Sequence, residues 1–212
     1  MNFKNLNNAN DIMDIFLKQN PIPKGKIKNP YLILIDGISG TGKSTVAKII
    51  SEKTDIVVLN NDKIRRFIYQ TSFNNIIEIE KLVKKIQYYR IEQVLKNGNN
   101  CLLDGNISSD FETKISILKQ INYKFYIIKL IYDREIVMER VKNRKFDENT
   151  FLINGSETIN YSKGNIDTFL TMEKEKYSIP KEYIYFEIDT SKDIKSIEKQ
   201  IEKLIEKIEK EG

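Results

Sequence analysis

Apolar residues along this chain fall into two patterns, short continuous runs and stripes at helical spacing. A continuous run rich in Ile, Leu and Val is typical of a strand buried on both faces of a parallel sheet. Such runs predict strands at 31–35, 56–59, 100–104, 125–132 and 183–189. Apolar residues three and four positions apart predict helices after Lys43 and over 8–19, 73–97, 111–120, 133–144, 167–177 and 194–208. Strands that alternate with helices indicate an α/β fold.

The loop between the first strand and the next helix carries a phosphate-binding signature. Its sequence, Gly37-Ile38-Ser39-Gly40-Thr41-Gly42-Lys43-Ser44-Thr45, fits Gly-x-x-x-x-Gly-Lys-[Ser/Thr] at every required position. Glycines let successive backbone N–H groups converge on an anion, and the helix start adds the positive end of its dipole. We expect Lys43 to contact the β- and γ-phosphates of ATP and the Ser44 hydroxyl to coordinate Mg²⁺. The other nucleotide-binding residues predicted in this loop are Gly37, Ser39, Gly40, Thr41, Gly42 and Thr45. The plainer alternative is a glycine turn before an ordinary helix.

Composition limits the chemistry. The 212 residues include no histidine, so a general base must be a carboxylate, a lysine or a tyrosine, and histidine metal sites are excluded. The single cysteine, Cys101, excludes a disulfide framework and a cysteine-rich zinc site. No apolar run reaches the length of a membrane span and the N-terminus lacks a secretion signal, so we expect a cytoplasmic protein without a membrane partner. The sequence carries no signal for an oligomeric state.

The chain is predicted to form one domain preceded by an extension. No linker rich in Pro, Gly and Ser divides it. We predict a helical extension and linker over 1–30, where prolines enforce an extended connection, and a P-loop domain over 31–212. Residues 145–163 are polar and irregular, which predicts a lid over about 140–164.

The formal net charge of +5 raises the question of a nucleic-acid partner. The excess consists of lysines scattered among glutamates, which is typical of solvated helix faces, so nucleic acid is not the favoured partner. Arginine is scarce, yet four arginines form two short pairs, Arg65 with Arg66 and Arg140 with Arg144. The planar fork of arginine binds phosphate and carboxylate bidentately, so these positions are candidates for anion contacts.

Two acidic residues follow predicted strands on the side where ligands bind in open α/β sheets. Asp62 comes after the second strand and is the candidate general base, with Arg65 on the same face if a helix begins there. Capping of that helix is an alternative role for Asp62 that does not exclude the first. Asp104 ends the third strand and is suited either to hold a Mg²⁺-bound water or to form an Asp-Gly turn.

Arg140 and Arg144 lie four residues apart on the helix before the lid. Two arginines on one side of a helix repel unless an anion lies between them, so we expect a phosphate clamp. Surface ion pairs with Glu139 or Asp147 are the alternative.

Residues 31–205 resemble the P-loop kinases of the nucleoside-monophosphate-kinase-like group, and within it the branch that contains polynucleotide kinase, chloramphenicol phosphotransferase and zeta toxins. The resemblance implies a three-layer fold with a five-stranded parallel sheet in the order 2-3-1-4-5, flanked by helices and a helical lid. It implies that Asp62 and Arg65 match an Asp-x-x-Arg that supplies the base and a substrate-binding arginine, and that Arg140 and Arg144 match lid arginines. Thr190, in Ile188-Asp189-Thr190-Ser191, matches a loop that passes the adenine.

The chain also departs from related kinases. It resembles cytidylate kinases from Ile35 to Lys48, but the Asp-Thr-Gly segment after their second strand is absent, and so is the Gly-Gly segment of shikimate kinases, which disfavours both substrates. We therefore predict an ATP- and Mg²⁺-dependent kinase that phosphorylates a hydroxyl of a small molecule or nucleotide. A polynucleotide 5′-hydroxyl kinase and a non-catalytic ATP-dependent switch are the alternatives.

Overall fold

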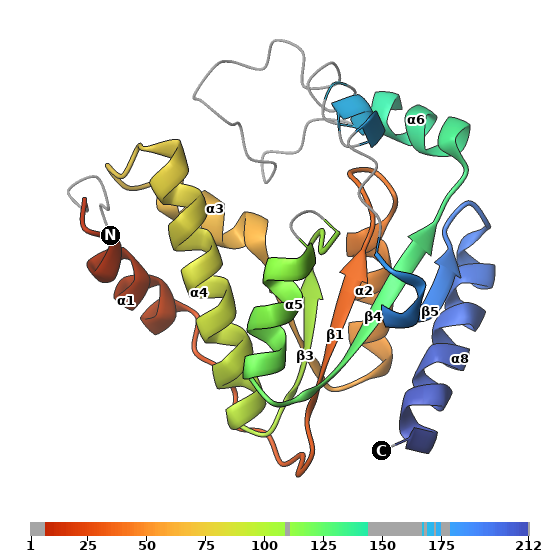
Figure 1. Ribbon diagram of the computed structural model, residues 1–212, viewed down its shortest axis with the longest axis horizontal. Helices are drawn as coiled ribbons and strands as arrows, with labels where there is room; N and C mark the ends of the chain where they lie inside the picture. The colour runs from red at the N-terminus through yellow and green to blue at the C-terminus, as the bar shows by residue number, and fades with distance from the viewer. Residues whose placement is uncertain are drawn as a thin grey trace.

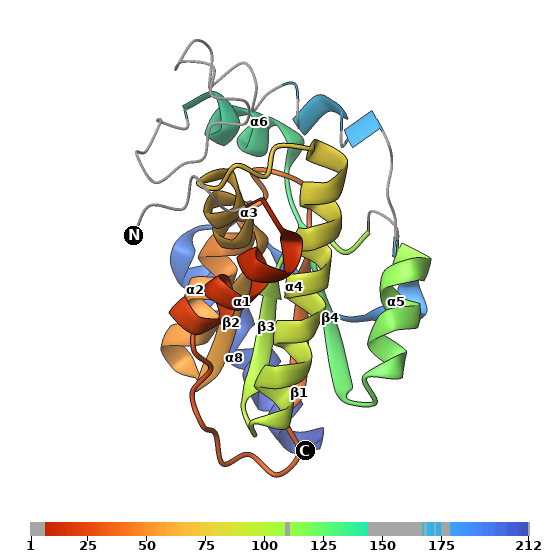
Figure 2. The same cartoon turned by 90° about the vertical axis from the view of Figure 1, so that its left-hand side faces the viewer.

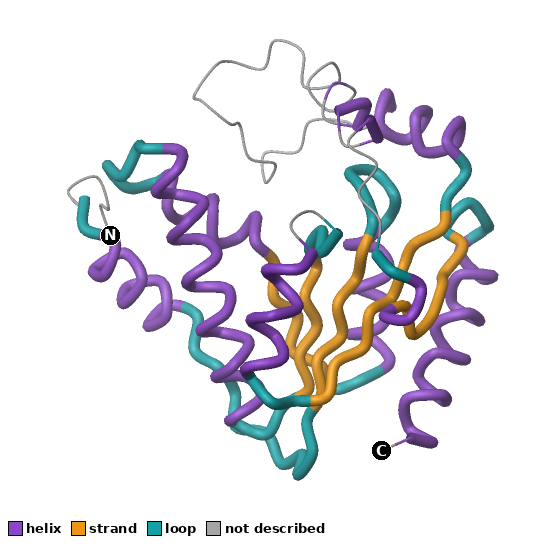
Figure 3. Tube along the Cα trace, viewed as in Figure 1, coloured by secondary structure: helices purple, strands orange, loops and turns teal. Residues whose placement is uncertain are grey.

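The computed structural model describes residues 7–108, 111–143, 167, 169–171, 173–174 and 179–211. Its centre is a five-stranded sheet in the order β2-β3-β1-β4-β5, in which all neighbouring strands run parallel. This order and the α/β fold class confirm the predictions from the sequence. The strands are β1 (Tyr31–Asp36), β2 (Ile56–Asn60), β3 (Asn100–Asp104), β4 (Lys124–Ile131) and β5 (Ile184–Asp189). Figure 3 shows them side by side in the middle of the molecule.

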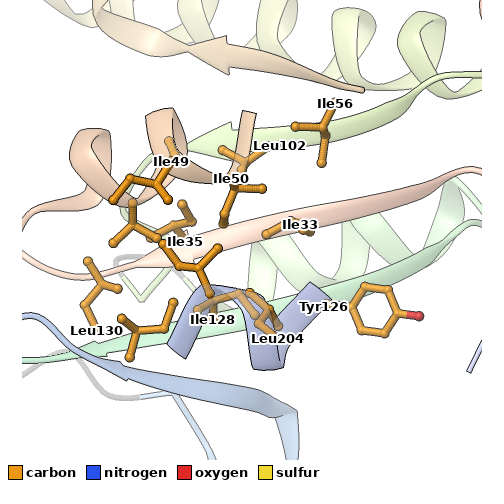
Figure 4. Close-up of a cluster of buried hydrophobic side chains, with 14 of the residues drawn as sticks. Ile33, Ile35, Ile49, Ile50, Ile56, Leu102, Tyr126, Ile128, Leu130 and Leu204 are labelled. Carbon is orange, nitrogen blue, oxygen red and sulfur yellow. The ribbon is translucent and has the colours of Figure 1, made fainter. Parts of the chain in front are cut away.

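Helices cover both faces of the sheet, as the continuous apolar strands require. In β1, Ile33 and Ile35 point to one face and pack with α2 (Lys43–Lys53) and α8 (Ile194–Glu211). Figure 4 shows this cluster, with Leu204 of α8 against the sheet. Leu32 and Leu34 point to the other face and pack with α4 (Ile76–Lys96) and α5 (Phe111–Gln120). The result is a three-layer arrangement, and Figure 1 shows α4 and α5 on the left of the sheet and α8 on its right.

The predicted N-terminal helix is present and packs on two other helices. Helix α1 (Ala9–Gln19) buries Ile12 and Phe16 against α3 (Asn61–Tyr69) and α4. Figure 2 shows α1 beside α4, below α3. The buried guanidinium of Arg90 in α4 donates a 2.6 Å hydrogen bond to the carbonyl of Asn20 at the end of α1. The extension is therefore anchored by a polar contact as well as by apolar packing.

The linker after α1 runs along the turn before β3. The N–H of Gly25 donates to the Asn97 carbonyl at 2.8 Å, and the N–H of Ile27 donates to the Gly98 carbonyl at 2.9 Å. A Cβ on Gly25 would lie 1.9 Å from the Gly98 carbonyl oxygen, so only glycine allows this approach.

Several element boundaries differ from the prediction. Helix α4 begins at Ile76, not at residue 73, because the Asn75 side chain caps it by accepting from the N–H groups of Ile77 and Glu78. Helix α3 is capped by Asn60, whose Oδ1 accepts from the N–H groups of Asp62 and Lys63. The capping role considered for Asp62 is therefore wrong, and the Asp62 side chain is left for another function.

The remaining elements are α6 (Arg134–Asn143) and a short 3₁₀ helix over Lys181–Tyr183. Residues 167, 169–171 and 173–174 are helical, within the helix predicted at 167–177. Arg144 and the predicted lid segment at 145–163 lie outside the described residues. Across the part of the chain that the structure describes, no helix is long and apolar enough to cross a membrane.

Candidate functional site

A cavity of about 780 Å³ opens at the carboxyl ends of the strands. Its wall combines the glycine-rich loop, the beginning of α3, the end of β3, the inner faces of α4 and α5, and Arg140 with Val141 of α6. The predicted site residues that line it are Ser39, Gly40, Gly42, Lys43, Ser44, Thr45, Asp62, Arg65, Asp104 and Arg140. The fold thus brings the predicted phosphate loop, base and metal ligands to one chamber.

The glycine-rich loop joins β1 to α2 and takes a shape that requires its glycines. Gly40 and Gly42 have φ angles of +85° and +93°, in the left-handed region that side chains rarely adopt. A Cβ on Gly40 would lie 2.4 Å from Val141 Cγ2 of α6, and one on Gly37 would lie 2.5 Å from Thr41 Oγ1. The loop is therefore packed closely against α6 and against itself, which fixes the path of its backbone N–H groups.

Two loop side chains make internal contacts. Lys43 Nζ donates to the carbonyls of Gly37 and Ile38 at 2.8 and 2.9 Å. Thr41 is fully buried and its hydroxyl donates to the Ile38 carbonyl at 2.8 Å. The backbone N–H of Thr41 also donates to the Ile38 carbonyl, at 3.4 Å, so Thr41 closes a turn within the loop.

Ser44 and Asp104 meet at the floor of the cavity. Ser44 Oγ donates to Asp104 Oδ2 at 2.8 Å, and Asn60 Nδ2 donates to the same oxygen at 2.9 Å. A hydroxyl beside a carboxylate is a pair of hard oxygen ligands, which suits Mg²⁺ or its bound water. Among the described residues, no group of three or more acidic, histidine or cysteine side chains could hold a metal by itself.

Asp62 lies in an ion-pair chain with Arg65 and Glu80. Arg65 Nη1 donates to Asp62 Oδ1 at 3.0 Å, while Nε and Nη2 donate to the two carboxylate oxygens of Glu80 at 2.7 and 2.9 Å. The hydrogen bonds between Arg65 and Glu80 raise the pKa of Arg65 and lower the pKa of Glu80. The Asp62 side chain remains 74% exposed and accessible from the cavity.

Helix α6 and the loop after β5 flank the phosphate loop. Val137 and Val141 are buried with Ile38 of the loop, which places the preceding Arg140 at the cavity wall. Thr190 is buried, and its hydroxyl donates to the Ile131 carbonyl at 3.1 Å. A Cβ on Gly42 would lie 3.8 Å from Cβ and Cγ2 of Thr190. Thr190 thus lies beside the phosphate loop but is not among the residues that line the cavity.

A family model described as an AAA domain (AAA_33) matches residues 32–165. The chain belongs to this family. The match begins in β1 and includes the phosphate loop, the Asp62 segment and Asp104.

Curated relatives of this AAA_33 domain include cytidylate kinases of clostridia. The protein of Clostridium botulinum strain Hall is 29% identical over 118 residues, which cover 54% of this chain and 52% of the relative. The protein of Clostridium perfringens strain SM101 is 32% identical over 95 residues, or 40% and 44% of the two chains. The chain thus spans about half the length of the curated relatives it matches.

Solved structures that are similar to this chain include several kinases. Shikimate kinase from Bacteroides thetaiotaomicron has a TM-score of 0.56 at 14% identity, covering 84% of this chain and 98% of that one. APS kinase from Mycobacterium tuberculosis, in complex with AMPPNP and APS, has a TM-score of 0.55 at 14% identity, covering 85% and 98%. A gluconokinase from Sinorhizobium meliloti has a TM-score of 0.52 at 14% identity, covering 86% and 98%. At these identities the likeness shows the fold.

Sequence reasoning missed two carboxylates in and beside the candidate site of this AAA_33 domain. Asp36, at the end of β1, is buried and its Oδ1 accepts from the N–H groups of Ile107 and Ser108 at 3.1 and 2.8 Å. It ties the loop after β3 to the start of the phosphate loop. The signal was an acid at the end of an apolar strand. Glu80 carried no such signal, because its partner Arg65 lies on another helix.

Proposed function

We propose that this AAA_33 domain is an ATP- and Mg²⁺-dependent kinase that transfers the γ-phosphoryl group to a hydroxyl of a small molecule or nucleotide. One observation carries the proposal: Lys43, Ser44, Asp104 and Asp62 line the same cavity. A phosphate loop alone would serve any nucleotide-binding protein, whereas an accessible carboxylate in the same chamber supplies a base. The similarity to cytidylate kinases and to kinases of several other substrates supports a phosphotransferase.

The residues would divide the reaction between them. The loop N–H groups and Lys43 would bind the triphosphate, for which Lys43 exchanges its contacts with the carbonyls of Gly37 and Ile38 for phosphate oxygens. Ser44 and Asp104 would hold Mg²⁺, which supplies charge neutralisation to the phosphate oxygens. Positioning and electrostatic stabilisation account for most of the rate in this class of reaction.

The remaining predicted residues act on the transferred group and its acceptor. Asp62 would orient the acceptor hydroxyl and take its proton. Arg140 would neutralise charge on the phosphoryl group, and the same role is proposed for Arg144. Thr190 would lie in the loop that passes the nucleotide, where its hydroxyl donates to the Ile131 carbonyl and can still accept a hydrogen bond.

The direct test is an ADP-release assay against a panel of hydroxyl acceptors. The panel would hold nucleosides, oligonucleotide 5′ ends, sugars, glycerates and aminoglycoside-type antibiotics. We expect acceptor-dependent ADP release that Lys43→Ala abolishes without loss of the folded state. Normal activity in Lys43→Ala would refute the assignment. Oligonucleotide phosphorylation with steep salt dependence would favour the polynucleotide-kinase alternative.

A further inference from the structure

The part of the cavity that would receive the acceptor is lined by both acidic and basic side chains. We define the acceptor half by Asp62 and Arg65 of α3, Glu80 and Lys84 of α4, and Lys114 of α5, all of which line the cavity. The donor half is formed by the phosphate loop and Arg140. The inference below rests on the proposed kinase function.

Arg65 is the only arginine of the acceptor half among the described residues. Its guanidinium already binds Glu80 and Asp62. Its Nε and Nη2 atoms face the two oxygens of Glu80 in the parallel geometry that arginine uses to bind a carboxylate or a phosphate. Its Nη1 atom is directed to Asp62. A phosphate entering this half would have to displace Glu80 from the guanidinium and would face two carboxylates.

The two lysines of the acceptor half are also engaged. Lys84 lies one helical turn after Glu80, and its charge contributes to the lowered pKa of that carboxyl. Lys114 Nζ donates to the Asn106 carbonyl at 2.9 Å. Around Arg65 the charges of Asp62 and Glu80 balance those of Arg65 and Lys84, so the surroundings of this guanidinium offer no surplus of positive charge to an anionic acceptor. Lys114, which binds a neutral carbonyl on α5's side of the cavity, adds one positive charge to the acceptor half.

We propose that Glu80 sets the acceptor class by holding Arg65, so that the site selects an uncharged polyhydroxylated compound, such as a nucleoside or a sugar, and rejects nucleoside monophosphates. In this arrangement Arg65 positions Asp62 instead of binding the acceptor. The acceptor oxygen forms a bond to the γ-phosphorus, and the bond from that phosphorus to the β–γ bridging oxygen breaks. ADP leaves with the electron pair of that bond, and Asp62 takes the hydroxyl proton. Glu80 is thus a specificity-determining residue that touches neither reacting group.

The test compares cytidine with CMP, because the two differ by the phosphate alone. The protein is first saturated with Mg²⁺ and AMPPNP, so that CMP cannot occupy the donor half, and binding of each compound is measured by titration calorimetry. We expect wild-type protein to bind cytidine in preference to CMP. Glu80→Gln should raise the affinity for CMP by at least about tenfold, the effect of one charge-assisted hydrogen bond on the released Arg65 fork.

Glu78→Gln is the matched control. It removes the same charge from the same helix, but Glu78 pairs with Lys81 and does not line the cavity. We expect this variant to bind CMP as the wild type does. A gain of CMP affinity in Glu80→Gln cannot arise from damage to the fold. CMP binding tighter than cytidine in the wild type, or no gain in Glu80→Gln, would overturn the proposal.

The kinase proposal can fail separately. If the wild type does not bind AMPPNP, or releases no ADP with any acceptor, the proposed function is wrong whatever Glu80 does. If CMP is phosphorylated faster than cytidine, the domain is a kinase and only the role of Glu80 is wrong.

Discussion

Ser44 Oγ lies 2.8 Å from Asp104 Oδ2, which joins the first turn of α2 to the end of β3. These residues are 60 positions apart in the chain, and the register between β1 and β3, in which Ile35 pairs with Asp104, brings them together. The sequence predicted both as metal ligands, and their contact supports a shared Mg²⁺ role.

Asp104→Asn should weaken the use of Mg²⁺ while leaving the fold intact. The amide keeps the size of the side chain but loses the charge that attracts the cation. We expect the Mg²⁺ concentration for half-maximal ADP release to rise about 10–100-fold. Asp55→Asn, an exposed carboxylate at the opposite end of β2, is the control and should leave the Mg²⁺ titration unchanged. An unaltered Mg²⁺ requirement in Asp104→Asn would remove Asp104 from the metal site.

Gly40→Ala should impair nucleotide binding. The new methyl group would meet Val141 at 2.4 Å in a residue with φ of +85°, so the loop must shift. We expect affinity for AMPPNP to fall by about tenfold or more, in line with the cost of such backbone strain. Gly105→Ala lines the same cavity but its Cβ would meet nothing closer than 3.5 Å, so it should bind AMPPNP nearly as the wild type does. Equal affinity in both variants would contradict the packed-loop account.

Arg90→Met should destabilise the anchored extension. The substitution keeps an apolar stem but removes the donor to the Asn20 carbonyl and the cation 5.6 Å from the Phe16 ring centroid. We expect a loss of about 1–3 kcal/mol in the free energy of unfolding, measured by urea denaturation. Lys85→Met removes an exposed contact between the same two helices and should cost less than about 0.5 kcal/mol. Similar losses in the two variants would argue against a special role for the buried guanidinium.

The Glu80–Arg65 pair should make stability depend on acid pH. The hydrogen bonds that Glu80 accepts from Arg65 hold the pKa of Glu80 below the ordinary 4.5. The folded state therefore binds a proton at this carboxylate less readily than the unfolded chain does. The contribution is therefore complete above the ordinary pKa and is lost as pH falls through the lowered value. Because both side chains are partly exposed, we expect Glu80→Gln to cost only about 0.5–1 kcal/mol at pH 7, and progressively less as the pH falls through the lowered pKa of Glu80. A difference between the two proteins that does not shrink as the pH is lowered would contradict this origin.

The sequence predicted those features that depend on local pattern. Apolar runs located each strand that the described residues form, and the spacing of glycines with Lys43 and Ser44 located the phosphate loop. The pairing of Arg65 with Asp62 could be predicted because residues three positions apart on a helix lie on the same face. The contacts of Glu80 and Asp36 could not be predicted, because their partners lie on other elements. These partners come together only when α3 packs on α4 and β1 pairs with β3. The burial of the Thr41 and Thr190 side chains could not be predicted for the same reason.

The central claim is that the phosphate loop and Asp62 serve one reaction. Single-turnover phosphoryl transfer in Asp62→Asn, measured beside its affinity for AMPPNP, tests this most directly, with an acceptor that the wild type phosphorylates. We predict unchanged nucleotide affinity and a transfer rate lowered about 10²–10⁴-fold, the usual contribution of a general base. A transfer rate equal to that of the wild type would contradict the account and would leave Asp62 without a part in the chemistry.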